Sequence, residues 1–175
     1  MSRLSGKRIG VLVEEGFEDL EFWVPVMRLR EEGAEVVIIG SGRAEVFRGK
    51  HCLEARPDVA AEQVRPEDLD GLVVPGGWAP DKLRRVPAVL DRVRTLDAQG
   101  KVIASICHGG WVLISAGIVA GKRATGSRGI RDDLLNAGAI WVDEPAFRDG
   151  NLVWGRVVKD IPAFCRELVV ALAEG

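Results

Sequence analysis

Four short apolar runs, rich in β-branched residues, alternate with longer amphipathic segments along this chain. The runs cover residues 8–13, 34–40, 69–74 and 102–106. They predict strands buried on both faces, because a strand with one face in water alternates apolar and polar residues. Helical spacing of apolar residues predicts helices over 20–32, 87–98 and 161–173. This alternation predicts an α/β fold, a three-layer sandwich whose central, mostly parallel sheet has helices on both faces.

The remaining segments predict smaller elements around that sheet. Residues 41–57 indicate a short hairpin, and the turn signal Asp149-Gly150 indicates a second hairpin. A further helix is expected over 130–137, followed by a short apolar piece over 139–142. No repeat or linker interrupts the pattern, so we expect one domain over residues 1–175.

Composition excludes several classes of protein. The 175 residues are 47% hydrophobic and 29% charged, which is ordinary for a globular protein that buries a core without disulfides or metals. Lys and Arg number 24 against 26 acidic residues, so the net charge of −2 does not favour nucleic acid as a partner. No apolar stretch approaches the ~20 residues of a membrane span. Three cysteines argue against a disulfide framework, and we expect a cytoplasmic protein.

Cys107 falls at the turn between the strand over 102–106 and an apolar segment with helical spacing. A thiol at the positive end of a helix is expected to have a lowered pKa. His108 follows directly, and Gly109 and Gly110 carry no side chains that would block a ligand. This is the layout of a nucleophile elbow built on cysteine. It makes the chain a candidate enzyme.

Two other loops are predicted to meet Cys107 at the carboxyl edge of the sheet, where such folds bind ligands. One carries Glu18 and Glu21 after the first strand, and a protonated acid there would donate to the sulfur. The other contains Gly76-Gly77, whose N–H groups, with those of His108 and Gly109, are candidate oxyanion donors.

Each of these residues also has a structural interpretation. A free cysteine is usually a small buried hydrophobe, and we expect that of Cys165 on the apolar face of the last helix. Cys52 beside His51 suggests a metal, but two ligands do not make a site. Acids such as Glu18 are common in the first turn of a helix. We expect no metal and no cofactor.

The chain resembles the PfpI-type intracellular proteases and deglycases of the ThiJ/PfpI (DJ-type) superfamily. The resemblance covers nearly the whole sequence and is carried by an ordered set of motifs. They are Gly16-Phe-Glu-Asp-Leu-Glu21 with Pro25, Leu72-Val-Val-Pro-Gly-Gly77, Ala104-Ser-Ile-Cys-His-Gly109, Ile130-Arg-Asp-Asp-Leu-Leu-Asn-Ala-Gly-Ala139, Trp141-Val-Asp143 and Asp149-Gly150.

The resemblance implies a flavodoxin-like fold of the class I glutamine amidotransferase type, with Cys107 as nucleophile. It implies Glu21 as the acid beside the sulfur, with Glu18 close by. It also implies that His108 pairs with an acid of a neighbouring subunit, which in this sequence is Asp81. Members form homodimers, and some form hexamers built from dimers, so the site is expected at an interface.

Several positions depart from the family pattern. Gly110 stands where Pro or Ala is common, and Asp81 replaces the longer Glu. Trp154-Gly155 replace hydroxyl residues before Arg156, and Ser127-Arg128 replace an aromatic residue and Pro. These changes fall in regions that can line the pocket, so the resemblance alone does not carry the family's substrate over to this chain.

Three functions follow from a reactive thiol at this position. The first is a stress-associated cysteine hydrolase that acts on small carbonyl compounds or their protein adducts, with His108 and Glu21 moving protons. The alternative is a peptidase that uses an intersubunit set of Cys107, His108 and Asp81. A non-enzymatic alternative is a redox sensor or chaperone-like stress protein, because an exposed low-pKa thiol oxidises readily.

Overall fold

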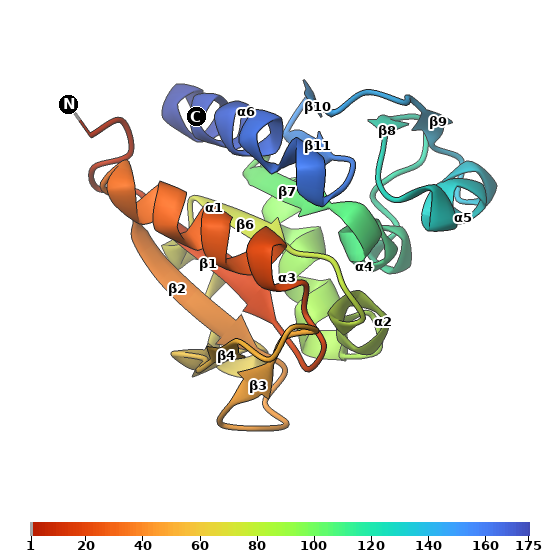
Figure 1. Cartoon of the computed structure of the whole chain (residues 1–175). Helices are drawn as coiled ribbons and strands as arrows, with labels where there is room; N and C mark the ends of the chain where they lie inside the picture. The colour runs from red at the N-terminus through yellow and green to blue at the C-terminus, as the bar shows by residue number, and fades with distance from the viewer. Residues whose placement is uncertain (1) are drawn as a thin grey trace.

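A seven-stranded sheet lies between two layers of helices in the computed structural model, which describes residues 2–175 (Figure 1). The strand order is β10-β11-β7-β6-β1-β2-β5, and all neighbours are parallel except β10 and β11. The strands are β1 (Arg8–Val13), β2 (Glu35–Gly40), β5 (Val59–Ala60), β6 (Gly71–Val74), β7 (Val102–Ile106), β10 (Ala146–Asp149) and β11 (Leu152–Gly155). The predicted three-layer α/β sandwich is confirmed.

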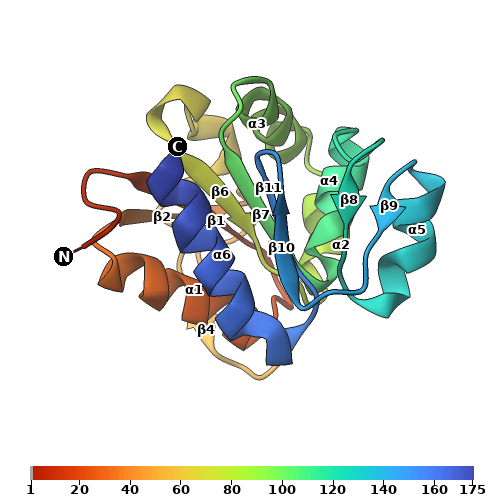
Figure 2. The same ribbon diagram turned by 90° about the horizontal axis from the view of Figure 1, so that it is seen from above.

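Helices cover both faces of the sheet, as Figure 2 shows from above. One face carries α1 (Asp19–Glu31) and α6 (Ile161–Glu174), while α3 (Pro87–Ala98) and α4 (Gly110–Ala116) cover the other. The short α2 (Ala79–Leu83) packs on α4, and α5 (Arg131–Asn136) lies beyond it. Two small sheets, β3 (Phe47–Arg48) with β4 (Glu54–Ala55) and β8 (Arg123–Ala124) with β9 (Ile140–Trp141), complete the fold.

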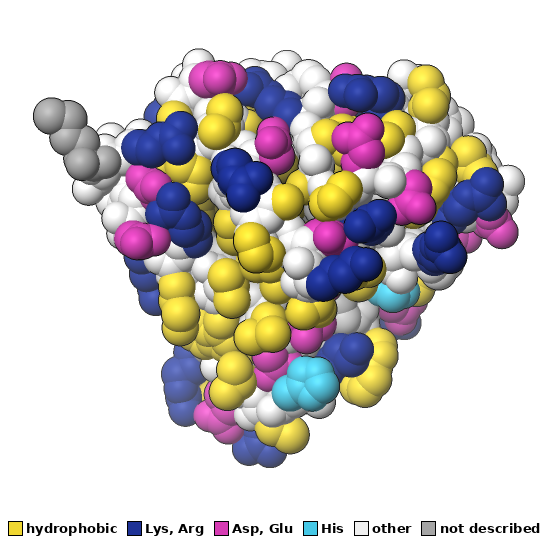
Figure 3. Space-filling view, turned by 45° about the horizontal axis from the view of Figure 1, so that its top comes forward, with side chains coloured by type: hydrophobic (Ala, Val, Ile, Leu, Met, Phe, Trp, Pro, Cys, Tyr) yellow, Lys and Arg dark blue, Asp and Glu magenta, His cyan; other side chains and the backbone are white. Residues whose placement is uncertain are grey.

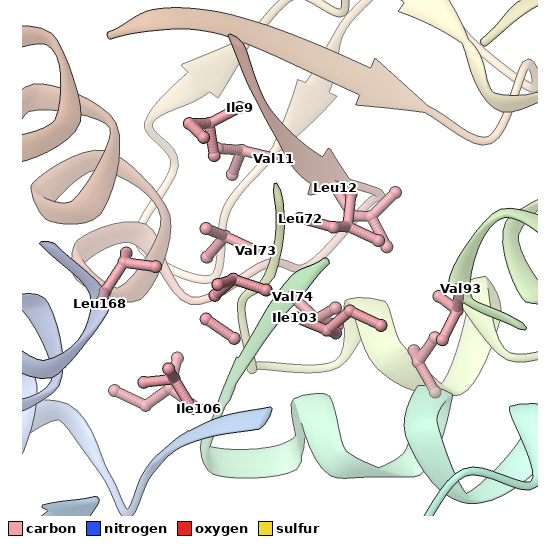
Figure 4. Close-up of a cluster of buried hydrophobic side chains, with 14 of the residues drawn as sticks. Ile9, Val11, Leu12, Leu72, Val73, Val74, Val93, Ile103, Ile106 and Leu168 are labelled. Atoms are coloured by element: carbon pink, nitrogen blue, oxygen red, sulfur yellow. The ribbon is translucent and has the colours of Figure 1, made fainter. Parts of the chain in front are cut away.

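The core fills both sides of the sheet (Figure 4). Leu168 of α6 reaches it from one side and Val93 of α3 from the other, with Val11 and Val73 in the strands between them. Burial of each such side chain stabilises the fold by about 1.5–3 kcal/mol relative to exposure. Burial on both faces is why the strands are apolar throughout, as the sequence predicted.

The strand order places the candidate loops together. β2 lies on one side of β1, while β6, β7 and β11 follow on the other, so the order reverses between β1 and β6. In open α/β sheets, ligands bind at the carboxyl ends of the strands at this point. The loops that follow β1, β6 and β7 begin there.

The predicted hairpins are present as β3–β4 and β10–β11, and the expected apolar piece over 139–142 contains β9. The sequence analysis missed β5, β8 and α2, which are too short to show a period. Among residues 2–175, no helix is both long and apolar enough to span a bilayer.

Candidate active site

Cys107 adopts a backbone conformation that few residues with a side chain adopt. Its φ is +59°, directly after β7, and a single 3₁₀ turn over Cys107–Gly109 leads into α4. The Ser127 N–H donates to the Cys107 carbonyl at 3.1 Å, which holds the turn. Left-handed backbone costs a residue with a Cβ roughly 1–2 kcal/mol. The predicted strand-to-helix turn is therefore present, and it is strained at the cysteine itself.

His108 contacts the thiol although the two residues are adjacent in the chain. The distance from His108 Nδ1 to Cys107 Sγ is 3.2 Å. The imidazole ring lies edge-on to Trp111, with ring centroids 5.1 Å apart. Burial and the positive charge of Lys50 lower the pKa of His108, so the ring is neutral at pH 7. A neutral ring in contact with the sulfur can accept a proton from the site.

Glu21 provides a buried carboxyl group at the same place. Its side chain is fully buried in α1, and Oε2 accepts a hydrogen bond from Gly76 N–H at 2.9 Å. Its other oxygen, Oε1, has no hydrogen-bond partner among the nitrogen and oxygen atoms of the described residues. Glu18 caps α1 by accepting from Glu21 N–H at 2.8 Å. Two carboxyl groups thus share the first turn of α1, and the inner one faces the thiol.

The neighbouring carboxyl and thiol groups change each other's pKa. Burial, and then the charge of Glu18, raise the pKa of Glu21 to about 7. Burial, and then the charge of Glu21, raise the pKa of Cys107 to about 12. The backbone N–H groups of His108 and Gly77 act on the sulfur in the opposite direction, but their effect is smaller. The sequence-based expectation that the helix end lowers the pKa of Cys107 is wrong in sign, because desolvation and a neighbouring carboxylate outweigh it.

Above pH 7, Cys107 and Glu21 therefore hold one proton between them. The carboxylate of Glu21 can take the thiol proton when the sulfur attacks a substrate. The two backbone N–H groups at the sulfur then stabilise the charge on the thiolate. Such a pair can supply a nucleophile and its base without a free thiolate at rest.

The loops after β1 and β6 hold each other through backbone contacts. Phe17 and Gly77 form an isolated β-bridge, and Trp78 N–H donates to Gly16 O at 2.7 Å. Gly76 permits the close approach, since a Cβ there would overlap the Glu21 carboxylate and the Cys107 Cβ. The predicted convergence of the three loops is confirmed by these contacts.

The four glycine and glutamate residues expected to bind substrate have different surroundings. Gly77 and Glu18 line the pocket in front of Cys107. Gly76 does not, because its N–H is already bound to Glu21 and cannot serve as an oxyanion donor. Gly109 is buried against the carbonyl of Val74, where it allows close packing of the turn on β6. For Gly76 the expected oxyanion role is therefore wrong, while for Gly109 it stays a prediction.

The pocket has a volume of about 550 Å³, within the usual range for small-molecule sites. Several of its lining residues were not predicted. They are Lys50, His51, Trp78, Trp111 and residues 157–159. The β3–β4 hairpin reaches the pocket because Asp19 accepts from His51 N–H at 2.8 Å and from Leu53 N–H at 2.9 Å. A contact 32 residues away in sequence leaves no local signal, apart from the polar Arg48-Gly-Lys50 turn.

Asp81 does not reach this pocket within the chain. It lies in α2 with its side chain 60% exposed, and its carboxylate pairs with Arg85 at 3.1 Å. The candidate metal ligands His51 and Cys52 lie on the hairpin. His51 Nε2 is 3.8 Å from Glu18 Oε1, and Cys52 is exposed. Residues 2–175 contain no group of three or more His, Cys, Asp or Glu side chains placed to hold a metal.

Two departures from the family pattern, Gly110 and Trp154, lie against each other. Trp154 is fully buried in β11 and does not line the pocket, contrary to the expectation from the sequence. A Cβ on Gly110 would lie 3.3 Å from its ring and 2.8 Å from Ile130 Cδ1. The glycine therefore makes room for the large side chain under α4. The two changes act on the core beneath the turn and not on the substrate.

Residues 7–171 match the model of the DJ-1/PfpI family. The chain belongs to the DJ-1/PfpI family. It is 43% identical over 165 residues to a deglycase of Pyrococcus abyssi, covering 94% of this chain and 99% of that one. It is 36% identical over 169 residues to general stress protein 18 of Bacillus subtilis, covering 95% and 98%.

A crystal structure from Anabaena variabilis, of a protein with DJ-1/ThiJ/PfpI-like and ferritin-like domains, has the same fold. It superposes with a TM-score of 0.93 at 38% identity, covering 95% of this chain and 48% of that one. The family resemblance inferred from the motifs is confirmed.

Proposed function

We propose that this chain is a stress-associated, cysteine-dependent enzyme that acts on small reactive carbonyl compounds and their adducts. The observation that carries the proposal is the contact of Cys107 Sγ with His108 Nδ1 at 3.2 Å beside a buried Glu21 whose pKa is about 7. Relatives named deglycases support the same chemistry. A carbonyl carbon is the electrophile that a thiol paired with a base attacks.

The first step forms a hemithioacetal with a 2-oxoaldehyde. The sulfur of Cys107 bonds to the aldehyde carbon while its proton passes to Glu21 and then to the new hydroxyl oxygen. The N–H groups of His108 and Gly77 lie at the sulfur and are placed to hold developing negative charge there. With an amine adduct of the aldehyde, the same attack expels the amine.

The second step moves hydrogen within the bound adduct. His108 or Glu21 removes the proton from the former aldehyde carbon, and the neighbouring carbonyl carbon receives one, which gives a 2-hydroxyacyl thioester. Water then cleaves the thioester and releases a 2-hydroxy acid and the thiol. The sum is addition of one water to the oxoaldehyde, and no external oxidant is needed.

Incubation with methylglyoxal and measurement of lactate tests this function. We expect turnover that falls at least about 1000-fold in Cys107→Ala, since the nucleophile is removed. Cys165→Ala serves as the control, because that thiol is buried in the core, and it should retain activity. If Cys107→Ala makes lactate at the wild-type rate, the proposal is wrong.

A redox role is the second candidate for the same thiol. It is supported by the carboxyl of Glu21 beside the sulfur, which in its protonated form can donate to a sulfinate. Mild peroxide should then add oxygen to Cys107 and leave the buried Cys165 unmodified, as intact-mass and peptide-mass measurements would show. Oxidation of both thiols at the same rate would exclude a sensor.

The peptidase alternative depends on Asp81 of a neighbouring copy. Within the chain this carboxylate is paired with Arg85, so orientation of His108 by Asp81 requires the assembly. If Asp81→Asn leaves any Cys107-dependent peptide cleavage unchanged, the intersubunit set of three residues is excluded.

We propose that the chain forms a homodimer or a larger homo-oligomer. An apolar patch on α1 and the β3–β4 hairpin supports this: Leu20, Met27 and Leu53 are 48%, 62% and 50% exposed. A second copy would cover it. Light scattering should give a mass above one chain that falls in Met27→Glu, and a wild-type monomer would contradict the proposal.

A further inference from the structure

A second, smaller hollow adjoins the Cys107 pocket and has basic walls. Its volume is about 230 Å³, and its lining residues are Gly126, Arg128, Asp143, Arg156, Val157 and Lys159. Val157 and Lys159 also line the Cys107 pocket, so the two hollows meet at these residues. Figure 3 shows basic side chains beside the histidines on this face.

The charges in this hollow do not cancel. Arg156 donates to Asp143 at 2.9 Å and to Asp160 at 3.0 Å. Asp143, the acidic residue of the lining, is therefore already paired with Arg156. Arg128 forms a second, longer ion pair with Asp143 at 3.7 Å, and its side chain is 87% exposed. Lys159 has no ion-pair partner among residues 2–175. The lining therefore carries three cationic side chains against the one carboxylate of Asp143, which both arginines share.

The hollow is fixed relative to the nucleophile. The loop that carries Arg128 is tied to the Cys107 turn by the hydrogen bond from Ser127 N–H to the Cys107 carbonyl. On the other side of Arg128, a Cβ at Gly129 would lie 3.4 Å from His108 Nε2. One small molecule can therefore reach from Arg128 and Lys159 to the thiol of Cys107.

We propose that this hollow is an anion subsite, which binds a carboxylate or phosphate group of a substrate whose carbonyl carbon lies at Cys107. Arg and Lys side chains bind these groups by charge-assisted hydrogen bonds. A volume of about 230 Å³ holds such a terminal group but is small for a separate ligand. The inference rests on the proposed carbonyl chemistry and predicts that anionic substrates are preferred over neutral ones.

Two aldehydes of similar length test the subsite during turnover. The anionic one is 4,5-dioxopentanoate and the neutral one is 2-oxopentanal. We expect a higher kcat/KM for the anionic aldehyde at low salt, and a ratio of the two that falls about threefold in Arg128→Ala or Lys159→Ala and about tenfold in the double variant. Arg131→Ala, an exposed arginine outside both hollows, should keep the wild-type ratio.

Alkylation of Cys107 tests the subsite without turnover. N-Iodoacetylglycine and its neutral amide both lose iodide to the sulfur, and they differ only in the carboxylate. The anionic reagent should react faster with the wild type, and the double variant should remove the difference. Inorganic phosphate and acetate, added as competitors in separate arms, show which of the two groups the subsite prefers.

The two arms separate the possible failures. If neither aldehyde is turned over but the carboxylate still accelerates alkylation, the proposed function fails and the subsite stands. The second failure concerns the ratio of anionic to neutral rates, for the aldehydes and for the alkylating reagents. If Arg128→Ala and Lys159→Ala change neither ratio, the anion subsite is excluded, whether or not the enzyme turns over aldehydes.

Discussion

Cys165 is buried in the core, whereas Cys107 is partly buried and lines the pocket. Burial raises the pKa of Cys165 to about 11, and burial together with Glu21 raises that of Cys107 to about 12. Cys165 lies in the apolar face of α6 and has helical backbone. Cys107 has left-handed backbone and contacts an imidazole and a carboxyl group. Burial alone makes a thiol inert, while burial beside a proton acceptor makes a nucleophile and its base.

The largest expected difference between the two thiols is in their rates of alkylation. In a Cys52→Ser background, which removes the exposed thiol, iodoacetamide should modify Cys107 at least about 100-fold faster than Cys165. Cys165 reacts only when α6 opens, since it is covered by the core. Peptide mass analysis over time gives both rates. Equal rates would mean that the neighbours of Cys107 do not activate it.

The second difference is in how the free energy of unfolding changes with pH. Glu21, beside Cys107, makes it change, while no such group among residues 2–175 lies beside Cys165. The pKa of Glu21 is about 7 in the folded chain, against an ordinary value of 4.5, so the unfolded chain loses this proton first and stability falls between pH 4.5 and 7. The loss at higher pH is about 3 kcal/mol. Glu21→Gln should remove it, making the variant more stable than the wild type at pH 8 but not at pH 4.

Urea unfolding at both pH values measures this effect, and Cys165→Ala provides the comparison. That variant should lose the same stability at pH 4 and pH 8, because its core position holds no group that titrates in this range. If the stability of Glu21→Gln changes between pH 4.5 and 7 in the same way as that of the wild type, Glu21 is not desolvated.

The smallest expected difference has opposite signs at the two thiols. Cys107→Gly should be about 1 kcal/mol more stable than Cys107→Ala, because glycine adopts a φ of +59° without strain. Cys165→Gly should be about 1 kcal/mol less stable than Cys165→Ala, because glycine weakens a helix. Thermal unfolding of the four variants gives both differences. The same sign at both sites would contradict the strained turn.

The sequence predicted the parts of this site that are local. The strand over 102–106 and the helix after it appear in the pattern of apolar residues, and they place Cys107 at the turn between them. The sheet topology then brings the loops of Glu21 and Gly77 to the same edge.

Other parts of the site depend on contacts between distant segments. Asp19 carries the hairpin tip with Lys50 and His51 to the pocket, and no spacing in the sequence shows this. The direction of the pKa shift at Cys107 depends first on how deeply the thiol is buried and then on the charge of Glu21, and only the folded chain defines both. The folded chain also brings Glu21 to Gly76, whose N–H donates to the Glu21 carboxylate.

The pH dependence of Cys107 alkylation shows whether Cys107 and Glu21 share one proton. The measurement compares iodoacetamide rates from pH 5 to 10 in Cys52→Ser and in Cys52→Ser with Glu21→Gln. The wild-type pair should become reactive with a midpoint near pH 7, where it loses its first proton. Without the carboxylate, the midpoint should move up to or above the ordinary thiol value of 9.0. An unchanged midpoint in Glu21→Gln would contradict the account.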